Sequence, residues 1–146
     1  MSGPTVWTIG YEQATQPQVI AALQEAKVEL VADVRALPLS RRPGFSKTAL
    51  AGGLAEAGIG YWHARALGTP PDGRAAARAG DHAALERIYA GQLELPEAIA
   101  AGAELASLAG ERRVALLCYE REAAHCHRSL LRRAMLPAFE QVDLTP

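Results

Sequence analysis

The sequence contains only two cysteines, Cys118 and Cys126, and only two lysines, Lys27 and Lys47. Two cysteines cannot build the disulfide framework of a small secreted domain, and no charged segment followed by an apolar one marks a signal peptide at the N-terminus. No apolar run reaches the roughly 20 residues that a membrane helix needs. We therefore expect a soluble protein of a reducing cytoplasm, with no membrane as a partner.

The chain also lacks an excess of charge of either sign. Its 15 Lys and Arg residues are balanced by 16 Asp and Glu residues, giving a net charge of -1. Long-range attraction of nucleic acid is therefore excluded, and any anion site must be a local cluster. The cations are almost all arginine, whose planar guanidinium recognises phosphate and carboxylate well. A chain of 146 residues that is 49% hydrophobic has material for one core, so a single domain over 1–146 is expected.

Short apolar runs alternate with segments of helical spacing. The runs at 5–11, 29–36, 59–64 and 112–120 predict strands, with the last of them near the sheet centre, and "EQVDL" predicts a short final strand. This alternation indicates an α/β domain with a mainly parallel sheet of about five strands. Helices should cover both faces through right-handed crossovers, which makes a Rossmann-like three-layer sandwich.

Several residues indicate where helices begin and end. Ser46 and Asp81 are expected N-caps, Gly58 is expected at a helix C-terminus, and Pro96 suits a first helical turn. Residues 65–80 are the part of the chain richest in glycine and proline. We expect a mobile loop or lid there.

The polar residues of the predicted sheet gather at the strand ends. In open parallel sheets, ligands bind beyond the carboxyl ends of the strands. The residues at these ends are Tyr11 and Glu12, Asp33 and Arg35, His63, and Cys118 and Glu120. Asp33 and Arg35 lie on one face of their strand, close enough for an ion pair that would orient the arginine toward a cleft. A purely structural ion pair is the alternative.

The loop "SRRPGFSK" has the composition of an anion site. Gly44 permits a tight turn, Arg41, Arg42 and Lys47 supply positive charge, and the loop leads to the free N–H groups of a helix N-terminus. An exposed basic loop is the alternative. Neither G-x-x-x-x-G-K-[ST] nor, after the first strand, G-x-G-x-x-G occurs, so the sequence supports neither ATP hydrolysis nor dinucleotide binding, and no cofactor is expected.

The segment "CYEREAAHCHRSLLRR" contains both cysteines. Cys118 ends a strand, where cysteine is more often a small core residue than a nucleophile. Cys126 stands at the start of the last helix, where the helix dipole and Arg128 would lower its thiol pKa, although a simply packed cysteine is the alternative. A disulfide between them requires Cα atoms within about 7 Å, which the connecting loop allows.

Two further interpretations of this segment are disfavoured. The spacing H-C-x5-R from His125 to Arg132 resembles the nucleophile loop of cysteine-dependent phosphatases, but the core spacing of Leu130 and Leu131 indicates helix, with Arg128 among the residues away from its apolar stripe. A metal site is not expected, because consecutive helical residues point about 100° apart and no Cys-x-x-Cys pair is present.

Five stretches occur in the order of a known family: "TIGYE", "DVRALPLSRRPGFSK", "GIGYWHARALG", "LLCYERE" and "CHRSLL". From Thr8 to about Leu136 the chain resembles the family catalogued as domain of unknown function 488. The resemblance implies a small bacterial or archaeal α/β domain and no particular reaction. The positions that match are Gly10, Tyr11, Asp33, Arg35, Ser40, Arg41, Pro43, Gly44, Phe45, Ser46, Lys47, Leu67, Gly68, Cys118, Glu120, Cys126, His127 and Arg128. "EAAHC" departs from the family pattern, which has an acidic residue and proline before the second cysteine.

Together these residues predict a polar pocket above the strand ends. Its expected catalytic residues are Asp33, Glu120, Cys126 and His127. Its expected ligand-binding residues are Tyr11, Arg35, Ser40, Arg41, Gly44, Phe45, Ser46, Lys47 and Arg128. Tyr11 or Phe45 could stack on a base.

The leading functional hypothesis is binding of a phosphate-bearing small molecule or a short nucleic acid, followed by a reaction that the sequence does not identify. One alternative is a sulfur-transfer or thiol-redox enzyme that uses Cys126. The other is a non-catalytic effector-binding module over which residues 65–80 close.

Overall fold

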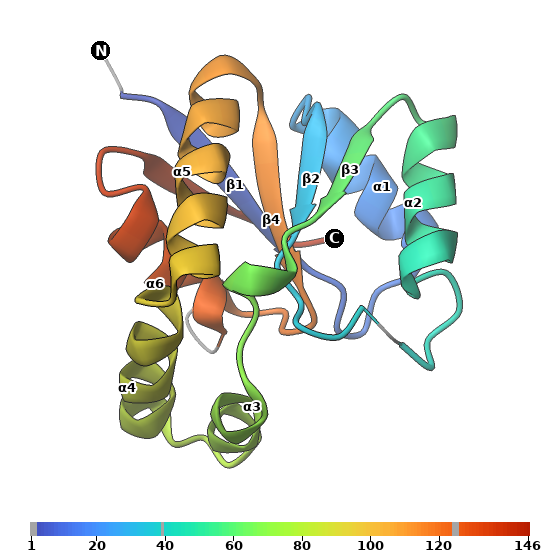
Figure 1. Ribbon diagram of the computed structural model, residues 1–146. Coiled ribbons are helices and arrows are strands. Elements are labelled where there is room, and N and C mark those ends of the chain that lie inside the picture. Colours follow the sequence, from blue (N-terminus) through green and yellow to red (C-terminus); the bar gives the residue numbers. More distant parts are fainter. Residues whose placement is uncertain (1–2, 39, 124–125) are drawn as a thin grey trace.

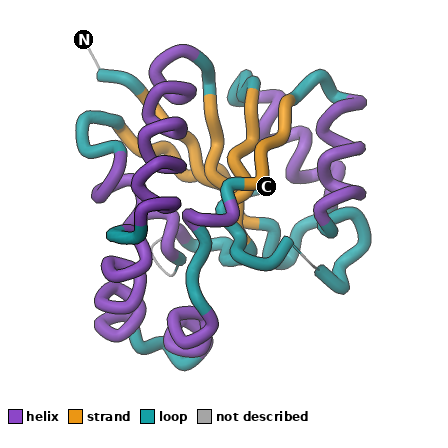
Figure 2. Tube along the Cα trace, viewed as in Figure 1, coloured by secondary structure: helices purple, strands orange, loops and turns teal. Residues whose placement is uncertain are grey.

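Five parallel strands form one sheet in the order β3-β2-β4-β1-β5 (Figures 1 and 2). The computed structural model describes residues 3–38, 40–123 and 126–146. The strands are β1 (Thr5–Gly10), β2 (Leu30–Asp33), β3 (Gly60–His63), β4 (Val114–Cys118) and β5 (Glu140–Leu144). The predicted parallel sheet is confirmed, and β4 occupies its centre as expected.

Six α-helices are present in the described part of the chain. They are α1 (Gln16–Glu25), α2 (Lys47–Glu56), α3 (Pro71–Arg78), α4 (His82–Leu93), α5 (Pro96–Glu111) and α6 (His127–Met135), with a short 3-10 helix η1 (Arg65–Leu67). α1 and α2 cover one face of the sheet, whereas α5 and α6 cover the other (Figure 1). The predicted three-layer α/β architecture is therefore confirmed. None of the described helices combines the length and apolar character that crossing a membrane requires.

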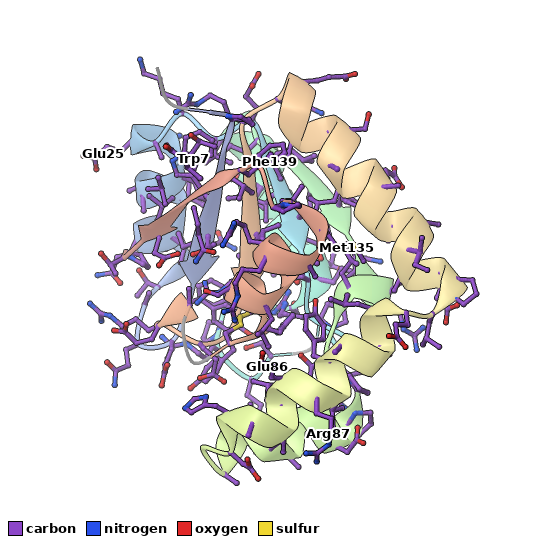
Figure 3. All side chains as sticks on the ribbon, turned by 90° about the vertical axis from the view of Figure 1, so that its left-hand side faces the viewer. Trp7, Glu25, Glu86, Arg87, Met135 and Phe139 are labelled. Atoms are coloured by element: carbon purple, nitrogen blue, oxygen red, sulfur yellow. A yellow bond between two sulfur atoms is a disulfide. The ribbon has the colours of Figure 1, made fainter. Side chains whose placement is uncertain are left out.

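Alternating residues of each strand enter two separate cores, because neighbouring side chains of a strand point to opposite faces. In β4, Leu116 and Cys118 pack on the side of α5 and α6, whereas Leu117 packs on the side of α1 and α2. This alternation directs Cys118 toward α6. On the same side, Met135 of α6 lies against α5, where a Cβ at Gly102 would be 2.5 Å from its sulfur (Figure 3).

The four residues that were expected at helix ends lie where the sequence placed them. Ser46 is the N-cap of α2, and the Asp81 carboxylate caps α4 by accepting a hydrogen bond of 3.1 Å from the backbone N–H of Ala84. Pro96 lies in the first turn of α5. Gly58 follows α2 with φ of +76°, the left-handed backbone that ends many helices and that glycine adopts most easily.

Residues 65–80 contain η1 and α3, where the sequence predicted a loop. Two side chains of α4 hold η1 in place: Tyr89 donates to the Leu67 carbonyl at 2.6 Å and Gln92 donates to the Ala66 carbonyl at 2.9 Å. α3 lies beside α4 beyond the carboxyl edge of the sheet (Figure 1). The mobility of this segment stays a prediction.

Gly10 and Gly68 allow backbone segments at the strand ends to pass very close to one another. A Cβ at Gly10 would lie 1.7 Å from the Glu120 carbonyl oxygen, and one at Gly68 would lie 2.3 Å from the backbone nitrogen of Ala36. Larger residues would push these loops apart. Both glycines therefore bring the segments after β3 and β4 close to those after β1 and β2.

Arg128 is fully buried, although the sequence placed it away from the apolar stripe of the last helix. Its guanidinium lies near the carboxylates of Glu122 and Asp143 and donates a hydrogen bond to the Glu120 carbonyl. Burial lowers the pKa of Arg128 to about 10. The expectation failed because the groups that cover this arginine come from a loop and from β5, which helical periodicity does not describe.

Arg132 is the arginine of the phosphatase-like spacing H-C-x5-R, and its side chain is bound elsewhere than at Cys126. Arg132 donates to the Phe139 carbonyl at 3.3 Å and to Gln141 Oε1 at 3.4 Å. His125, the first residue of that spacing, lies outside the described residues. The described residues therefore provide no phosphate-binding arginine for a phosphatase loop.

Candidate functional site

A cavity of about 600 Å³ opens at the carboxyl ends of β1, β2 and β4. The chain leaves β2 toward α2 on one face of the sheet and leaves β4 toward α6 on the other. Open parallel sheets bind ligands at the point where the chain leaves two neighbouring strands toward opposite faces of the sheet. Ser40 and Arg41 from the loop after β2 line the same cavity as Cys126 and His127.

The cavity contains about half of the residues that the sequence singled out. Those that line it are Tyr11, Arg35, Ser40, Arg41, Cys118, Glu120, Cys126 and His127. Those that do not line it are Asp33, Gly44, Phe45, Ser46, Lys47 and Arg128. The carboxyl ends of β1, β2 and β4 are therefore brought together, whereas the start of α2 is not part of the lining.

Two lining arginines were missed by the sequence analysis, Arg74 and Arg78 of α3. Their spacing of four residues places them on one face of a helix. The signal was present in "GRAAARAG", because alanine and arginine are strong helix formers. The glycines and prolines around this short run concealed it.

The lining is strongly cationic for a chain with a net charge of -1. Five arginines contribute to it, and Glu120 is the one carboxylate among the described lining residues. Arg74 is fixed by a hydrogen bond of 2.7 Å to the Thr69 carbonyl, and Arg42 donates to the Ala14 carbonyl. Arg41 and Arg78 are exposed, and their side chains form no hydrogen bond or ion pair with another described residue. Their guanidinium groups are therefore available to a ligand.

Asp33 and Arg35 form the predicted ion pair, and it is buried. Arg35 donates through Nε to Asp33 Oδ1 at 2.8 Å and through Nη2 to Oδ2 at 2.7 Å. Its Nη1 donates to the Tyr11 hydroxyl at 3.1 Å and to the Phe45 carbonyl at 2.7 Å. Four of its five N–H groups are thus occupied by the protein. Arg35 therefore has little hydrogen-bonding capacity left for a ligand, and the adjacent Asp33 carboxylate compensates its charge.

Asp33 contacts protein groups rather than the cavity. Tyr61 donates to Asp33 Oδ2 at 2.6 Å, in addition to the two bonds from Arg35. Burial lowers the pKa of Arg35, but the hydrogen bond and charge of Asp33 outweigh this effect and raise it above its ordinary value. Burial and the Asp33 hydrogen bond also raise the pKa of Tyr61. In this arrangement Asp33 orients Arg35.

The aromatic residues differ in their access to the cavity. Phe45 is fully buried and stacks on Tyr11, with ring centroids 4.4 Å apart, so it cannot stack on a base as the sequence suggested. Tyr119 also lines the cavity and is 43% exposed, with its ring at 80° to that of Tyr11. Tyr119 therefore offers the accessible ring.

The start of α2 makes internal contacts instead of an anion site in the cavity. The Lys47 backbone N–H donates to the Pro38 carbonyl at 2.9 Å, and the Gly44 carbonyl accepts from Gln16 Nε2 at 2.7 Å. Gly44 has φ of +89°, which agrees with the predicted tight turn. The basic loop contributes to the cavity through Ser40, Arg41 and Arg42.

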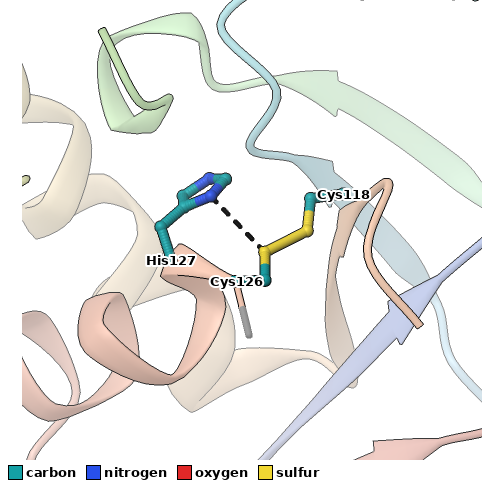
Figure 4. Close-up of side chains that lie close together, drawn as sticks. All are labelled: Cys118, Cys126 and His127. Atoms are coloured by element: carbon teal, nitrogen blue, oxygen red, sulfur yellow. Dashed lines mark hydrogen bonds between the residues drawn. A yellow bond between two sulfur atoms is a disulfide. The ribbon is translucent and has the colours of Figure 1, made fainter. Parts of the chain in front are cut away.

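Both cysteines lie at the cavity and are joined in a disulfide, a pairing that the sequence left open (Figure 4). Cys126 is the extended N-cap of α6, with φ of -132° and ψ of 165°. It is therefore not yet helical, and its sulfur lies 3.4 Å from Nδ1 of His127 (Figure 4). The expected divergence of consecutive helical residues does not occur between Cys126 and His127, because Cys126 precedes the helix. His125, the third residue of that run, lies outside the described residues.

His127 is held in one orientation by its surroundings. Its Nε2 lies 2.6 Å from the Val34 carbonyl oxygen, and its ring packs against the Tyr89 ring at 71°. A carbonyl can only accept, so this contact assigns the hydrogen to Nε2 and leaves the lone pair of Nδ1 facing Cys126. Burial lowers the pKa of His127 to about 4, although the Val34 hydrogen bond acts in the opposite direction. His127 is thus a neutral imidazole at pH 7.

The fold and this cavity define an α/β protein with an arginine-rich cavity at the carboxyl edge of a parallel sheet. The family described as "Domain of unknown function DUF488" matches residues 15–135, and the chain belongs to it. The predicted family membership is confirmed. No curated protein and no solved structure matches the chain.

Proposed function

We propose that the protein binds a phosphate-bearing molecule of nucleotide size in the cavity at the carboxyl edge. The observation that supports this proposal is the collection of five arginines and one carboxylate around about 600 Å³. This volume is in the range of small-molecule sites. Arginine is suited to phosphate because its fork can donate two parallel hydrogen bonds to the oxygens.

The distribution of charge favours a small ligand over a long nucleic acid. Tracking a phosphate backbone requires an extended basic stripe, which a chain with a net charge of -1 does not supply globally. The exposed ring of Tyr119 would stack on a base. A nucleotide satisfies both features, and a short oligonucleotide would present the same groups at its end.

Calorimetric titration with nucleoside mono- and diphosphates tests the proposal, with the matching nucleoside as reference. We expect the phosphorylated compounds to bind and Arg41→Ala/Arg78→Ala to lose at least about 100-fold in affinity, because each charge-assisted hydrogen bond contributes about 1.5–3 kcal/mol and the double variant removes two of them. Arg133→Ala, an exposed arginine of α6 outside the cavity, is the matched control. Equal affinity of the double variant and the control would refute the site, as would absence of binding by the unmodified protein.

A second function is favoured by the disulfide at the same cavity. A thiol-redox enzyme would oxidise a dithiol substrate to its disulfide while Cys118–Cys126 takes up two electrons and two protons. In the predicted reducing cytoplasm the resting pair would be thiols, and sulfur transfer would use Cys126 alone. Both activities require a reactive thiolate at Cys126.

Alkylation of reduced Cys118→Ser as a function of pH measures the thiol pKa of Cys126. A reactive cysteine predicts a midpoint below the free value of about 8.5, and a midpoint at or above it would contradict the thiol-based function.

A non-catalytic effector module would bind nucleotides through the same arginines. It would differ in leaving every bound nucleotide unchanged in a turnover assay.

A further inference from the structure

Three metal-ligating side chains converge at the inner end of the cavity. The sulfurs of Cys118 and Cys126 and a ring nitrogen of His127 lie within 4.8 Å of one another, and all three residues are buried. The ligand atoms of a tetrahedral zinc site lie about 3.5–4 Å apart, as follows from zinc–sulfur bonds of about 2.3 Å. The Cys126 sulfur and His127 Nδ1, which are 3.4 Å apart, are close to such positions, whereas the two sulfurs are bonded to each other and must separate before an ion can lie between them.

The separation of the two cysteine backbones is compatible with an ion between the sulfurs. Their Cα atoms are 7.6 Å apart. Most directly bonded cysteines have Cα atoms about 4.4–6.8 Å apart. Once the sulfur–sulfur bond is reduced, rotation of the two side chains suffices to open a space between the thiols.

His127 has the surroundings of a zinc-binding histidine. Such residues almost always donate their second ring N–H to a carbonyl or carboxylate, which fixes the tautomer. Here Nε2 donates to the Val34 carbonyl and Nδ1 faces Cys126, as Figure 4 shows for the second contact. The Tyr89 ring restricts rotation of the imidazole. The nitrogen with the available lone pair is thus the one that points to the sulfurs.

The fourth direction leads to the cavity. Cys118, Cys126 and His127 are all lining residues, and no fourth Cys, His, Asp or Glu ligand joins their cluster among the described residues. Structural zinc sites are closed by four protein ligands, whereas catalytic sites keep one position for water or substrate. Two cysteines and one histidine are an established set for the open type.

We propose that the reduced protein binds one zinc ion through Cys118 Sγ, Cys126 Sγ and His127 Nδ1, with its fourth position open to the cavity. This inference does not depend on binding of a phosphate-bearing ligand. Two thiolates and a neutral imidazole give an uncharged complex with the ion, which suits the buried inner end of the cavity. Soft thiolates also select zinc over magnesium or calcium, which prefer oxygen ligands.

The disulfide and the ion exclude each other, so reduction must come first. A trialkylphosphine and water convert the disulfide into two thiols and the phosphine oxide, with the phosphine oxidised by two electrons. The ion then replaces both thiol protons, and two protons are released for each zinc ion bound. Oxidation by a disulfide compound would reverse these steps: the Cys118–Cys126 bond would form again, the compound would be reduced to two thiols, and the ion would be released.

Titration of the reduced protein with Co²⁺ under anaerobic conditions, after removal of the phosphine, tests the site. We expect one equivalent to produce a thiolate-to-cobalt charge-transfer band and the visible bands of tetrahedral cobalt, both of which Zn²⁺ abolishes. Cys126→Ser and His127→Gln should each weaken binding by more than about 100-fold, since loss of an outer-shell partner alone costs about 10–100-fold. Absence of these bands in the reduced, folded wild-type protein would overturn the proposal.

Two controls keep the result interpretable. His82→Gln, at the exposed start of α4, should bind Co²⁺ as the wild type does, and the oxidised protein should not bind it. Circular dichroism of each variant establishes that it is folded. An unchanged cobalt spectrum in His127→Gln would overturn the three-ligand site. A nucleotide affinity unchanged by zinc would leave the metal site standing, because the two measurements are separate.

Discussion

Replacement of Asp33 by alanine is expected to lower the free energy of unfolding by about 3–5 kcal/mol, because it leaves a buried arginine without its partner. Asp33 is fully buried and Arg35 is 6% exposed, so water replaces the lost carboxylate poorly. For a domain of this size the change corresponds to a decrease of about 10 °C in the midpoint of thermal unfolding. Denaturant titration followed by circular dichroism measures it.

A double variant distinguishes the cost of the unpaired charge from the loss of packing. Asp33→Ala/Arg35→Met removes both charges and should be more stable than Asp33→Ala alone. Tyr61→Phe removes one hydrogen bond to Asp33 and should cost about 1 kcal/mol. If the double variant instead lost, relative to the wild type, the sum of the losses of Asp33→Ala and Arg35→Met, the two residues would not be coupled and the unpaired charge would not be the source of the effect.

The fold could be predicted from local patterns because each strand carries its own signal. Val114 to Leu117 form an unbroken apolar run, which is typical of a strand buried on both faces, and β4 is central. The order of the strands was not predictable in this way. It depends on which helices pack on which face, and the apolar stripes of the helices do not specify their partners.

The candidate site was predictable where it depends on topology. Since parallel strands end at one edge, Tyr11, Arg35 and Glu120 could be placed together without knowledge of the strand order. Residues supplied by α3 were missed because a short helix bounded by proline and glycine resembles a loop. Arg128 was misplaced because its burial depends on contacts with groups distant along the sequence.

The close approach of Cys118, Cys126 and His127 depends on the backbone conformation of one residue, Cys126. Had Cys126 been helical, its side chain would have pointed about 100° away from that of His127. Its extended φ and ψ instead bring the two side chains together. The position of a helix boundary within one residue is among the least certain features of any sequence-based prediction. In this protein that residue decides whether the side chains of Cys126 and His127 meet at the cavity.

The oxidised, metal-free protein is expected to lose about 3 kcal/mol of stability through His127 alone when the pH falls from 7 to 4. Burial lowers the pKa of this histidine to about 4, compared with 6.5 as its ordinary value. Between these values the unfolded chain binds a proton that the folded protein does not. The stability contributed by the neutral ring is therefore complete above pH 6.5 and is lost as the pH falls toward 4.

Other groups also titrate in this range, so the test compares variants. His127→Gln should show a decrease between pH 7 and 4 that is smaller by about 3 kcal/mol than that of the wild type, because glutamine can still donate to the Val34 carbonyl but does not titrate. Parallel curves for wild type and His127→Gln would mean that His127 binds its proton in the folded state as readily as in the unfolded chain. The imidazole would then not be the neutral, single-tautomer group that the Val34 contact and its burial require.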